Sequence, residues 1–356
     1  DRFETVGTDY YLKGETAMGW AGHSLEANLE QYQTINSYMG TEGLDGQADF
    51  VLYHAVVDNV FVSKSENYQH LDYWTNRSQD QYTPGSIMVP YVGSHDVPRL
   101  ASRADSGTSD AYNQWVEDGL PGQPGNKAAY DSVLQAYAWL LTTPGAPLIY
   151  YGDEYGEFGG ADPDNRHMYR NSSQWSNYEL ELYENISSIG KIRIDSEALR
   201  KGVYSTVHAE ADRLVYSMKS DNQEMHVILN RGSQWQWANI TDSDKIIFGE
   251  QPIDGNLPIP ENSVTIIERI SIPNSNQTDS IQGCTDSTAV NFDPDADDDD
   301  GSCEYDQNLT NQSNSQEENQ TQSGIEGCMN PDSVNFNSNA TKDDGSCILD
   351  VGKTNS

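Results

Sequence analysis

The order of apolar runs along the first two hundred residues restricts the fold more than any other feature of the chain. Four short runs predict β-strands, at residues 9–15, 48–53, 86–92 and 147–151. Helix-permissive stretches lie between and after them. The clearest spans Tyr130–Leu141, where apolar residues recur at helical spacing until Pro144 and Gly145. Strands that alternate with helices predict an α/β fold with a parallel sheet.

The period of the pattern changes to two after about residue 200. Arg213–Lys219 and Met225–Asn230 alternate apolar and polar residues, and Ser263–Arg269 is a further strand candidate. Short strands separated by Gly, Asn and Asp turns predict an antiparallel β-sandwich. We therefore expect a separate β domain over residues 200–270.

The last quarter of the chain contains two copies of one Cys/Asp-rich unit, at residues 283–305 and 327–349. A linker is expected at 271–282, and a disordered linker at 306–326. Four cysteines permit three disulfide connectivities, of which pairing within each copy closes each unit on itself. Such disulfides require an oxidising compartment, so we expect a secreted or cell-surface protein. The cysteines are Cys284, Cys303, Cys328 and Cys347.

The charge balance restricts the partners. The chain has 56 Asp and Glu against 20 Lys and Arg, a formal net charge of −36. Such a surface repels nucleic acid and anionic membranes, and no run reaches the ~20 apolar residues of a membrane span. We expect neither nucleic-acid binding nor a membrane span, whereas a neutral ligand or a cation is compatible with this charge.

Three polar motifs follow the predicted strands in order. Ser94-His95-Asp96 ends the third run, Tyr150-Tyr151-Gly152-Asp153-Glu154 ends the fourth, and a loop with Asp162 and Arg166 comes next. This order closely resembles the last third of an α-amylase-type barrel of glycoside hydrolase family 13. The resemblance implies that residues 1–199 form the second half of a (β/α)8 TIM barrel, strands 5–8. Half a barrel leaves two open edges, so we expect a fragment of a longer protein.

The resemblance also implies catalytic roles. Glu15, after Leu12-Lys13-Gly14, corresponds to the acid/base of a retaining glycosidase, and Asp96 to the carboxylate that stabilises the transition state. His95 would hydrogen-bond the sugar. The family's nucleophile is an Asp in a Gly-x-Arg-x-Asp strand end, and no segment before Glu15 supplies it. We therefore expect a glycoside hydrolase whose chain is inactive alone.

Four further residues are candidate substrate contacts, each with a structural alternative. Asp162 and Arg166 would bind glucose hydroxyls, or form a surface salt bridge. Arg99 would bind substrate, or pair with a carboxylate. Trp20 would stack on a sugar, or pack in the core. Glu15 and the His95-Asp96 pair could likewise serve only as turns or helix caps.

The resemblance leaves several activities open. An α-glucan or maltooligosaccharide substrate is implied for a hydrolase of the α-amylase type. The same motifs serve α-glucan transglycosylases and trehalose-forming isomerases. A non-catalytic glucan-binding relative that has lost its nucleophile is a further alternative.

Metal ligands are expected only in the tail. Asp293, Asp295 and Asp297 place carboxylates at alternate positions, as calcium sites do, although a solvated acidic turn has the same pattern. No organic cofactor is expected. The remaining histidines show no metal-ligand spacing, and we predict no ligand role for them: His23, His54, His70, His167, His208 and His226.

Overall fold

The computed structural model of the protein describes residues 10–40, 43–269, 282–291, 296, 298–299 and 302–304. The chain contacts divide it into two compact units, of which the first ends at Asn276 and the second begins at Gln277. Each unit is described by itself.

Four segments of the first unit run side by side in the same direction. Strand β1 (Lys13–Gly14) pairs in parallel with β2 (Gly46–Gln47). Isolated parallel bridges continue the order, from Ala48 to Val89 and from Tyr91 to Leu148. The pairing is short in part because Pro90 and Pro147 have no backbone N–H to donate. The predicted parallel α/β arrangement is thus confirmed.

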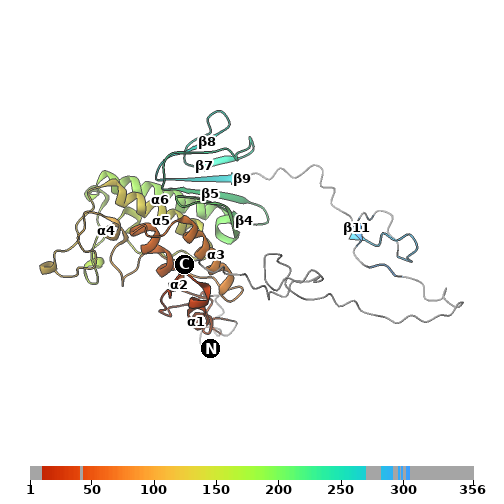
Figure 1. The fold of residues 1–356 in the computed structure, drawn as a ribbon, viewed down its shortest axis with the longest axis horizontal. Helices are drawn as coiled ribbons and strands as arrows, with labels where there is room; N and C mark the ends of the chain where they lie inside the picture. The colour runs from red at the N-terminus through yellow and green to blue at the C-terminus, as the bar shows by residue number, and fades with distance from the viewer. Residues whose placement is uncertain are drawn as a thin grey trace, which may run out of the picture. The chain divides into compact units, whose positions relative to one another are not determined.

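Helices connect and cover these segments (Figure 1). Asn126 and Ser176 cap the two longest helices, and Ser176 forms a capping box with Glu179. A π-helical segment, η2 (Val57–Val62), continues the second helix. The α-helices are α1 (Leu25–Asn36), α2 (Phe50–Val56), α3 (Tyr68–Gln81), α4 (Leu100–Ala104), α5 (Lys127–Thr142), α6 (Asn177–Asp195) and α7 (Glu197–Lys201).

The predicted strand at residues 48–53 is wrong, because a helix begins at Phe50. The Asp49 carboxylate accepts a hydrogen bond from the Leu52 amide at 3.1 Å and caps α2. The following residues are apolar and buried, so their pattern alone does not distinguish a buried strand from a buried helix. Only Ala48 retains the strand pairing that was predicted for this run.

An antiparallel sheet follows the helices in the chain. Its strand order is β3, β4, β5, β9, β7, and a separate ribbon pairs β6 with β8. Helix α5 lies against β5 and β9 of the sheet (Figure 1). The bounds are β3 (Val203–Ala209), β4 (Arg213–Lys219), β5 (Glu224–Asn230), β6 (Trp235–Trp237), β7 (Lys245–Phe248), β8 (Leu257–Ile259) and β9 (Ser263–Arg269).

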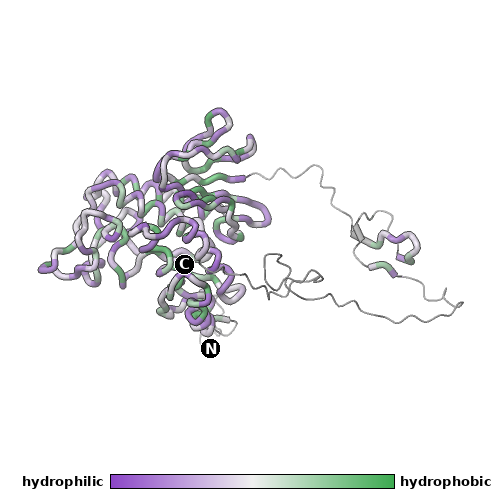
Figure 2. The backbone as a smooth tube through the Cα atoms, viewed as in Figure 1, coloured by the Kyte–Doolittle hydropathy of each residue, from purple (hydrophilic) through white to green (hydrophobic). Residues whose placement is uncertain are grey.

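Both faces of this sheet are covered. Alternate residues Leu214 and Tyr216 join the core that the helices share, whereas Val215 packs with the β6–β8 ribbon around Trp237 and Leu257. Successive side chains of a strand point to opposite faces, so a sheet buried on both sides has nearly continuous apolar strands. Figure 2 shows this hydrophobic character along the strands of the sheet.

The second unit contains one disulfide among its described residues. Cys284 and Cys303 are bonded, which confirms the first of the two predicted pairs. Two short parallel strands, β10 (Gln282–Gly283) and β11 (Asp298–Asp299), lie in the same repeat. The predicted pair of Cys328 with Cys347 and the predicted calcium ligands Asp293, Asp295 and Asp297 lie outside the described residues.

Among the described residues, no helix combines the length and apolarity needed to cross a bilayer.

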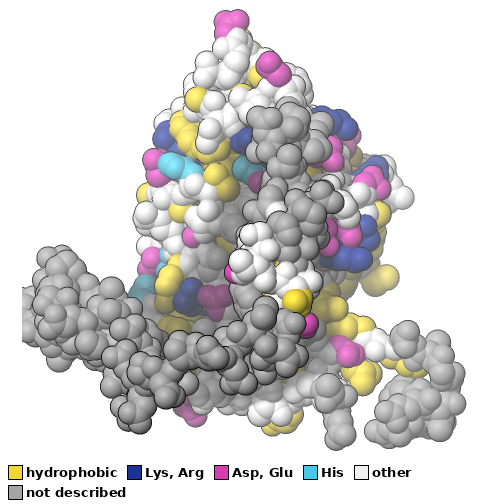
Figure 3. All heavy atoms as spheres, turned by 90° about the vertical axis from the view of Figure 1, so that its right-hand side faces the viewer, with side chains coloured by type: hydrophobic (Ala, Val, Ile, Leu, Met, Phe, Trp, Pro, Cys, Tyr) yellow, Lys and Arg dark blue, Asp and Glu magenta, His cyan; other side chains and the backbone are white. Residues whose placement is uncertain are grey.

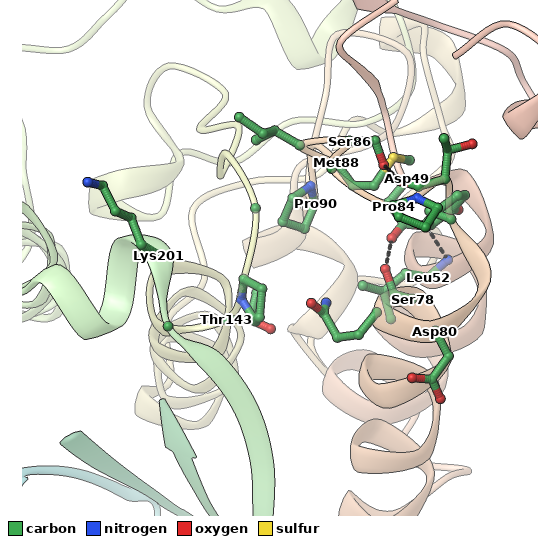
Figure 4. Close-up of a pocket in the computed structure, with 18 of the residues that line it drawn as sticks. Asp49, Leu52, Ser78, Asp80, Pro84, Ser86, Met88, Pro90, Thr143 and Lys201 are labelled. Atoms are coloured by element: carbon green, nitrogen blue, oxygen red, sulfur yellow. Dashed lines mark hydrogen bonds between the residues drawn. The ribbon is translucent and has the colours of Figure 1, made fainter. Parts of the chain in front are cut away.

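Asp49 also anchors α3 to the sheet. Its carboxylate accepts hydrogen bonds from Ser78 and from the Tyr82 hydroxyl, the latter at 2.6 Å, and Figure 4 shows Asp49 directed toward Ser78. Burial raises the pKa of Asp49, and the hydrogen bonds from Ser78, Tyr82 and Leu52 oppose the increase. The carboxylate is therefore both a hydrogen-bond hub and a buried charge.

Replacing Asp49 tests these two roles separately. We expect Asp49→Ala to lower the free energy of unfolding by about 2–4 kcal/mol, because three donors lose their acceptor. Asp49→Asn keeps an acceptor without the charge and should lose less. A raised pKa means that this group's contribution to stability is lost as pH rises through that pKa. Urea denaturation at a series of pH values should show this fall in stability in the wild type and not in Asp49→Asn. Equal losses of unfolding free energy in Asp49→Ala and Asp49→Asn at every pH would contradict the account.

Candidate active site

Two carboxylates follow segments of the parallel ladder that lie on either side of the β2–Ala48 segment. Glu15 comes directly after β1, and Asp96 lies five residues after Tyr91, which bridges to Leu148. Parallel segments have their carboxyl ends at one edge of the sheet, so both residues leave the ladder on the same side. Both side chains are exposed to solvent. The structure thus brings the two predicted catalytic residues to one edge.

The Tyr91 phenol connects these carboxylates electrostatically. Burial raises the pKa of Tyr91, and the nearby Tyr53, Asp49, Glu15 and Asp96 raise it further. The contributions of Glu15 and Asp96 mean that both carboxylates lie within electrostatic range of one phenol. The Tyr91 ring stacks on Tyr53, with centroids 4.4 Å apart and planes at 5°. Tyr91 is therefore a closely packed ring within electrostatic range of both acids.

His95 is paired with the neighbouring carboxylate. Its Nε2 lies 3.1 Å from Oδ1 of Asp96, and half of the His95 side chain is exposed. The Ser94 hydroxyl also accepts a hydrogen bond from the Asp96 amide at 3.2 Å. These contacts orient Asp96 while leaving it accessible from solvent.

Asn165 is a site residue that the sequence analysis missed. Its side-chain amide donates to the carbonyl oxygens of His95 and Val97, at 2.8 and 2.9 Å. The residue is fully buried. These two hydrogen bonds hold the backbone on both sides of Asp96. A single Asn in an Asn-rich chain does not indicate a functional residue by itself. The only signal in the sequence is that Asn165 lies in the same loop motif as Asp162 and Arg166.

Arg99 lies inside the structure, which corrects its predicted contact with substrate. Its Nη1 donates to Asp153 Oδ1 at 2.9 Å and to the Tyr151 carbonyl at 2.6 Å, and its Nε donates to the Asn165 carbonyl at 2.8 Å. The side chain has no exposed surface. A guanidinium that is enclosed in this way cannot touch a sugar, so the alternative of pairing with a carboxylate describes Arg99.

The ion pair is packed closely by its neighbours. The Arg99 guanidinium lies over the Tyr150 ring at 4.1 Å, and Tyr137 donates to Asp153 Oδ2 at 3.0 Å. Burial raises the pKa of Asp153, and the charge of Arg99 opposes the increase. A Cβ at Gly93 would lie 2.4 Å from Asp153 Oδ2, so this glycine lets the strand approach the carboxylate.

Asp162 and Arg166 form a surface ion pair at the same end of the ladder. Arg166 Nε lies 2.6 Å from Asp162 Oδ1, and each side chain is nearly half exposed. The hydrogen bond that Arg166 donates to Asp162 is the main cause that raises the pKa of Arg166, with smaller contributions from Tyr150 and Asp96. The pair is therefore within electrostatic range of Asp96, and its predicted contact with sugar stays a prediction.

Trp20 is engaged by other rings. It packs edge-on against His23, His70 and Trp74, with centroids 5.0, 5.7 and 6.0 Å apart. The side chain is partly buried against the main core. These contacts support the packing alternative for Trp20 over stacking on a sugar.

A cavity of about 500 Å³ lies elsewhere in the first unit. Figure 4 shows several of its lining residues, including Asp49, Pro84, Ser86 and Thr143. Residues 83–86 and 143–145 precede the strand segments, whereas Glu15 and Asp96 follow them, and neither carboxylate lines the cavity. The cavity is thus separate from the candidate active site, which is an open surface.

One face of the molecule is mixed in charge. Figure 3 shows acidic side chains spread over the described part of one face, with basic side chains between them. The large acidic excess of the chain therefore forms no single anionic patch on that face.

Comparison with known proteins gives consistent matches. Residues 23–177 match the family model described as alpha amylase, catalytic domain. An amylopullulanase of Thermoanaerobacter thermohydrosulfuricus is 26% identical over 211 residues, which are 58% of this chain and 13% of that protein. A cyclomaltodextrin glucanotransferase of Klebsiella oxytoca is 25% identical over 252 residues, 65% of this chain and 35% of that protein. The chain thus spans a minor part of these relatives.

Solved structures share the fold. The α-amylase of Geobacillus thermoleovorans in complex with acarbose aligns with a TM-score of 0.56 at 19% identity, over 75% of this chain and 55% of that chain. The ligand-free cyclic alpha-maltosyl-(1→6)-maltose hydrolase of Arthrobacter globiformis aligns with a TM-score of 0.54 at 18% identity, over 73% and 50%. The chain therefore has the fold of about half of each.

Variants of the buried ion pair test its structural role. We expect Arg99→Met to lower the free energy of unfolding by about 3–5 kcal/mol, because Asp153 remains as an unpaired buried charge. Removing both charges in Arg99→Met/Asp153→Leu should restore much of the loss. Urea denaturation measures each value. Arg166→Ala, at the exposed pair, is the matched control and should unfold like the wild type. Additive losses in the double variant would show that the two side chains act independently.

Proposed function

We propose that the chain is part of a retaining α-glucan hydrolase, because residues 23–177 match the family model of the alpha amylase catalytic domain. The observation that carries the proposal is the placement of Glu15 and Asp96 at one edge, within range of Tyr91. The substrate would be an α-glucan or a maltooligosaccharide. Within the (β/α)8 barrel of that family, residues 1–199 would form the second half, strands 5–8.

Glu15 would be the general acid and base. It protonates the glycosidic oxygen as the bond to the anomeric carbon breaks, and a carboxylate attacks that carbon to form a glycosyl ester. Water that loses its proton to Glu15 then hydrolyses the ester, which gives net retention. The exposure of Glu15 is compatible with this role, since both the leaving oxygen and the water must reach the carboxylate.

Asp96 would stay ionised and favour the positive charge that develops on the sugar ring. His95 holds it at 3.1 Å, and the bonds of Asn165 to the flanking carbonyl oxygens limit its movement. Asp162 and Arg166 would bind hydroxyl groups of a neighbouring glucose unit. Exchanging their mutual ion pair for bonds to sugar costs little at an exposed site.

The attacking carboxylate is not supplied by the sequence that precedes Glu15. A covalent mechanism without its nucleophile loses the step that forms the glycosyl ester. We therefore infer that residues 1–356 alone do not turn glucans over.

Secretion and calcium binding extend the proposal to the tail. The disulfide between Cys284 and Cys303 supports an oxidising compartment, and thus a secreted or surface-attached protein. Calcium binding by Asp293, Asp295 and Asp297 remains a prediction from their spacing.

The isolated chain should release no reducing ends from maltodextrin. The measurement is a reducing-sugar assay over many hours, with a commercial α-amylase as the positive control. Background rates are expected because the nucleophile is lacking. Sustained release that Glu15→Gln abolishes would show that the chain contains a complete catalytic site.

In a protein that joins this chain to a segment supplying the attacking carboxylate, Glu15→Gln should lower kcat by about 10²–10⁴-fold, since general acid catalysis contributes factors of this size. Glu30→Gln on exposed α1 is the matched control and should keep the wild-type rate. Analysis of products from maltoheptaose separates hydrolysis from transfer and from trehalose formation. Equal rates for the two variants would remove Glu15 from the mechanism.

A further inference from the structure

Three potential metal ligands converge away from the catalytic carboxylates. One atom each of His23, Glu66 and His70 lies within 4.8 Å of the other two. His23 precedes α1, Glu66 precedes α3, and His70 lies in the first turn of α3. Residues four apart at a helix start face the same side, so Glu66 and His70 point together. Sequence spacing did not reveal the group, because His23 lies 43 residues before Glu66.

His70 is already oriented for coordination. Its Nε2 lies 2.9 Å from the Ala55 carbonyl oxygen, which only accepts, so Nε2 carries the proton. In the neutral ring Nδ1 then has the free lone pair, and Nδ1 faces Glu66. Histidine ligands of metals commonly donate their second nitrogen to a backbone carbonyl in this way.

The distances fit a metal ion after small movements. Glu66 Oε2 lies 3.6 Å from His70 Nδ1, and Glu66 Oε1 lies 3.8 Å from His23 Nε2. Tetrahedral ligands at bonds of about 2.0–2.1 Å are about 3.4 Å apart. The three ligand atoms lie within 4.8 Å of one another, so binding an ion requires a movement on the order of 1 Å. His23 is two-thirds exposed, which leaves it free to make this movement.

The surroundings favour coordination. The rings of Trp20 and Trp74 pack beside His70, at centroid distances of 5.7 and 6.2 Å, and form an apolar wall. Such a wall limits the access of water to the site and so strengthens the electrostatic attraction between the ion and its ligands. The chain's charge of −36 also attracts cations.

We propose that His23, Glu66 and His70 bind one divalent transition-metal ion, with zinc as the ion that best suits two imidazoles and a carboxylate. Calcium and magnesium prefer oxygen ligands, so this site is chemically distinct from the acidic repeats. Three protein ligands leave a fourth position for water. The bound ion joins the segment before α1 to the start of α3 and stabilises the folded chain. The proposal is independent of the glycosidase assignment.

Zinc titration of the full chain tests the site. Isothermal calorimetry is done with ZnCl2 in an excess of Ca²⁺, which saturates oxygen-ligand sites in the tail. We expect one zinc site, an increase in Tm on zinc addition, and at least about tenfold weaker binding for His23→Ala and for Glu66→Gln. Both substituted side chains are at least partly exposed, so the variants should fold.

His208→Ala is the matched control. Its Nε2 lies 3.3 Å from Glu210 Oε1, but it belongs to no three-residue group among the described residues. Zinc affinity should be unchanged in this variant. Absence of zinc binding, or affinity that neither His23→Ala nor Glu66→Gln lowers, would overturn the proposal. So would an equal loss in His208→Ala.

Discussion

The buried ion pair of Arg99 and Asp153 is the interaction on which the candidate active site depends. It joins the segment after Tyr91, the turn after Leu148 and the loop at Asn165. Burying two charges is costly unless they are paired and hydrogen-bonded. Here the guanidinium also bonds two backbone carbonyls, and Tyr137 bonds the carboxylate. The geometry of three loops thus follows from one buried ion pair.

That arrangement explains how an exposed Asp96 keeps a defined position. Arg99 holds the backbone of Asn165, and the Asn165 side chain holds the carbonyl oxygens on both sides of Asp96. The parallel ladder independently brings Glu15 to the same edge. Positioning therefore comes from buried polar contacts, while the proposed catalytic groups remain open to solvent, as a binding site for a polymer requires.

Much of the fold could be predicted from the sequence where periodicity is strong. The strands at 213–219 and 263–269 have the predicted bounds, and α5 contains the predicted helical face. Local patterns failed where a strand and a helix would bury the same apolar run. This is the case after Asp49, whose side chain caps the start of a helix. They also failed where contacts join distant residues, as in Asn165 and the group of His23, Glu66 and His70, because a single sequence does not encode distance.

The central claim is that Glu15 and Asp96 face one sugar. A crystal structure of the chain with bound maltoheptaose measures this directly. The account predicts one glucose ring within hydrogen-bond distance of both carboxylates, with the next ring beside Asp162 and Arg166. A maltooligosaccharide bound at some other surface, with neither carboxylate touching it, would contradict the claim.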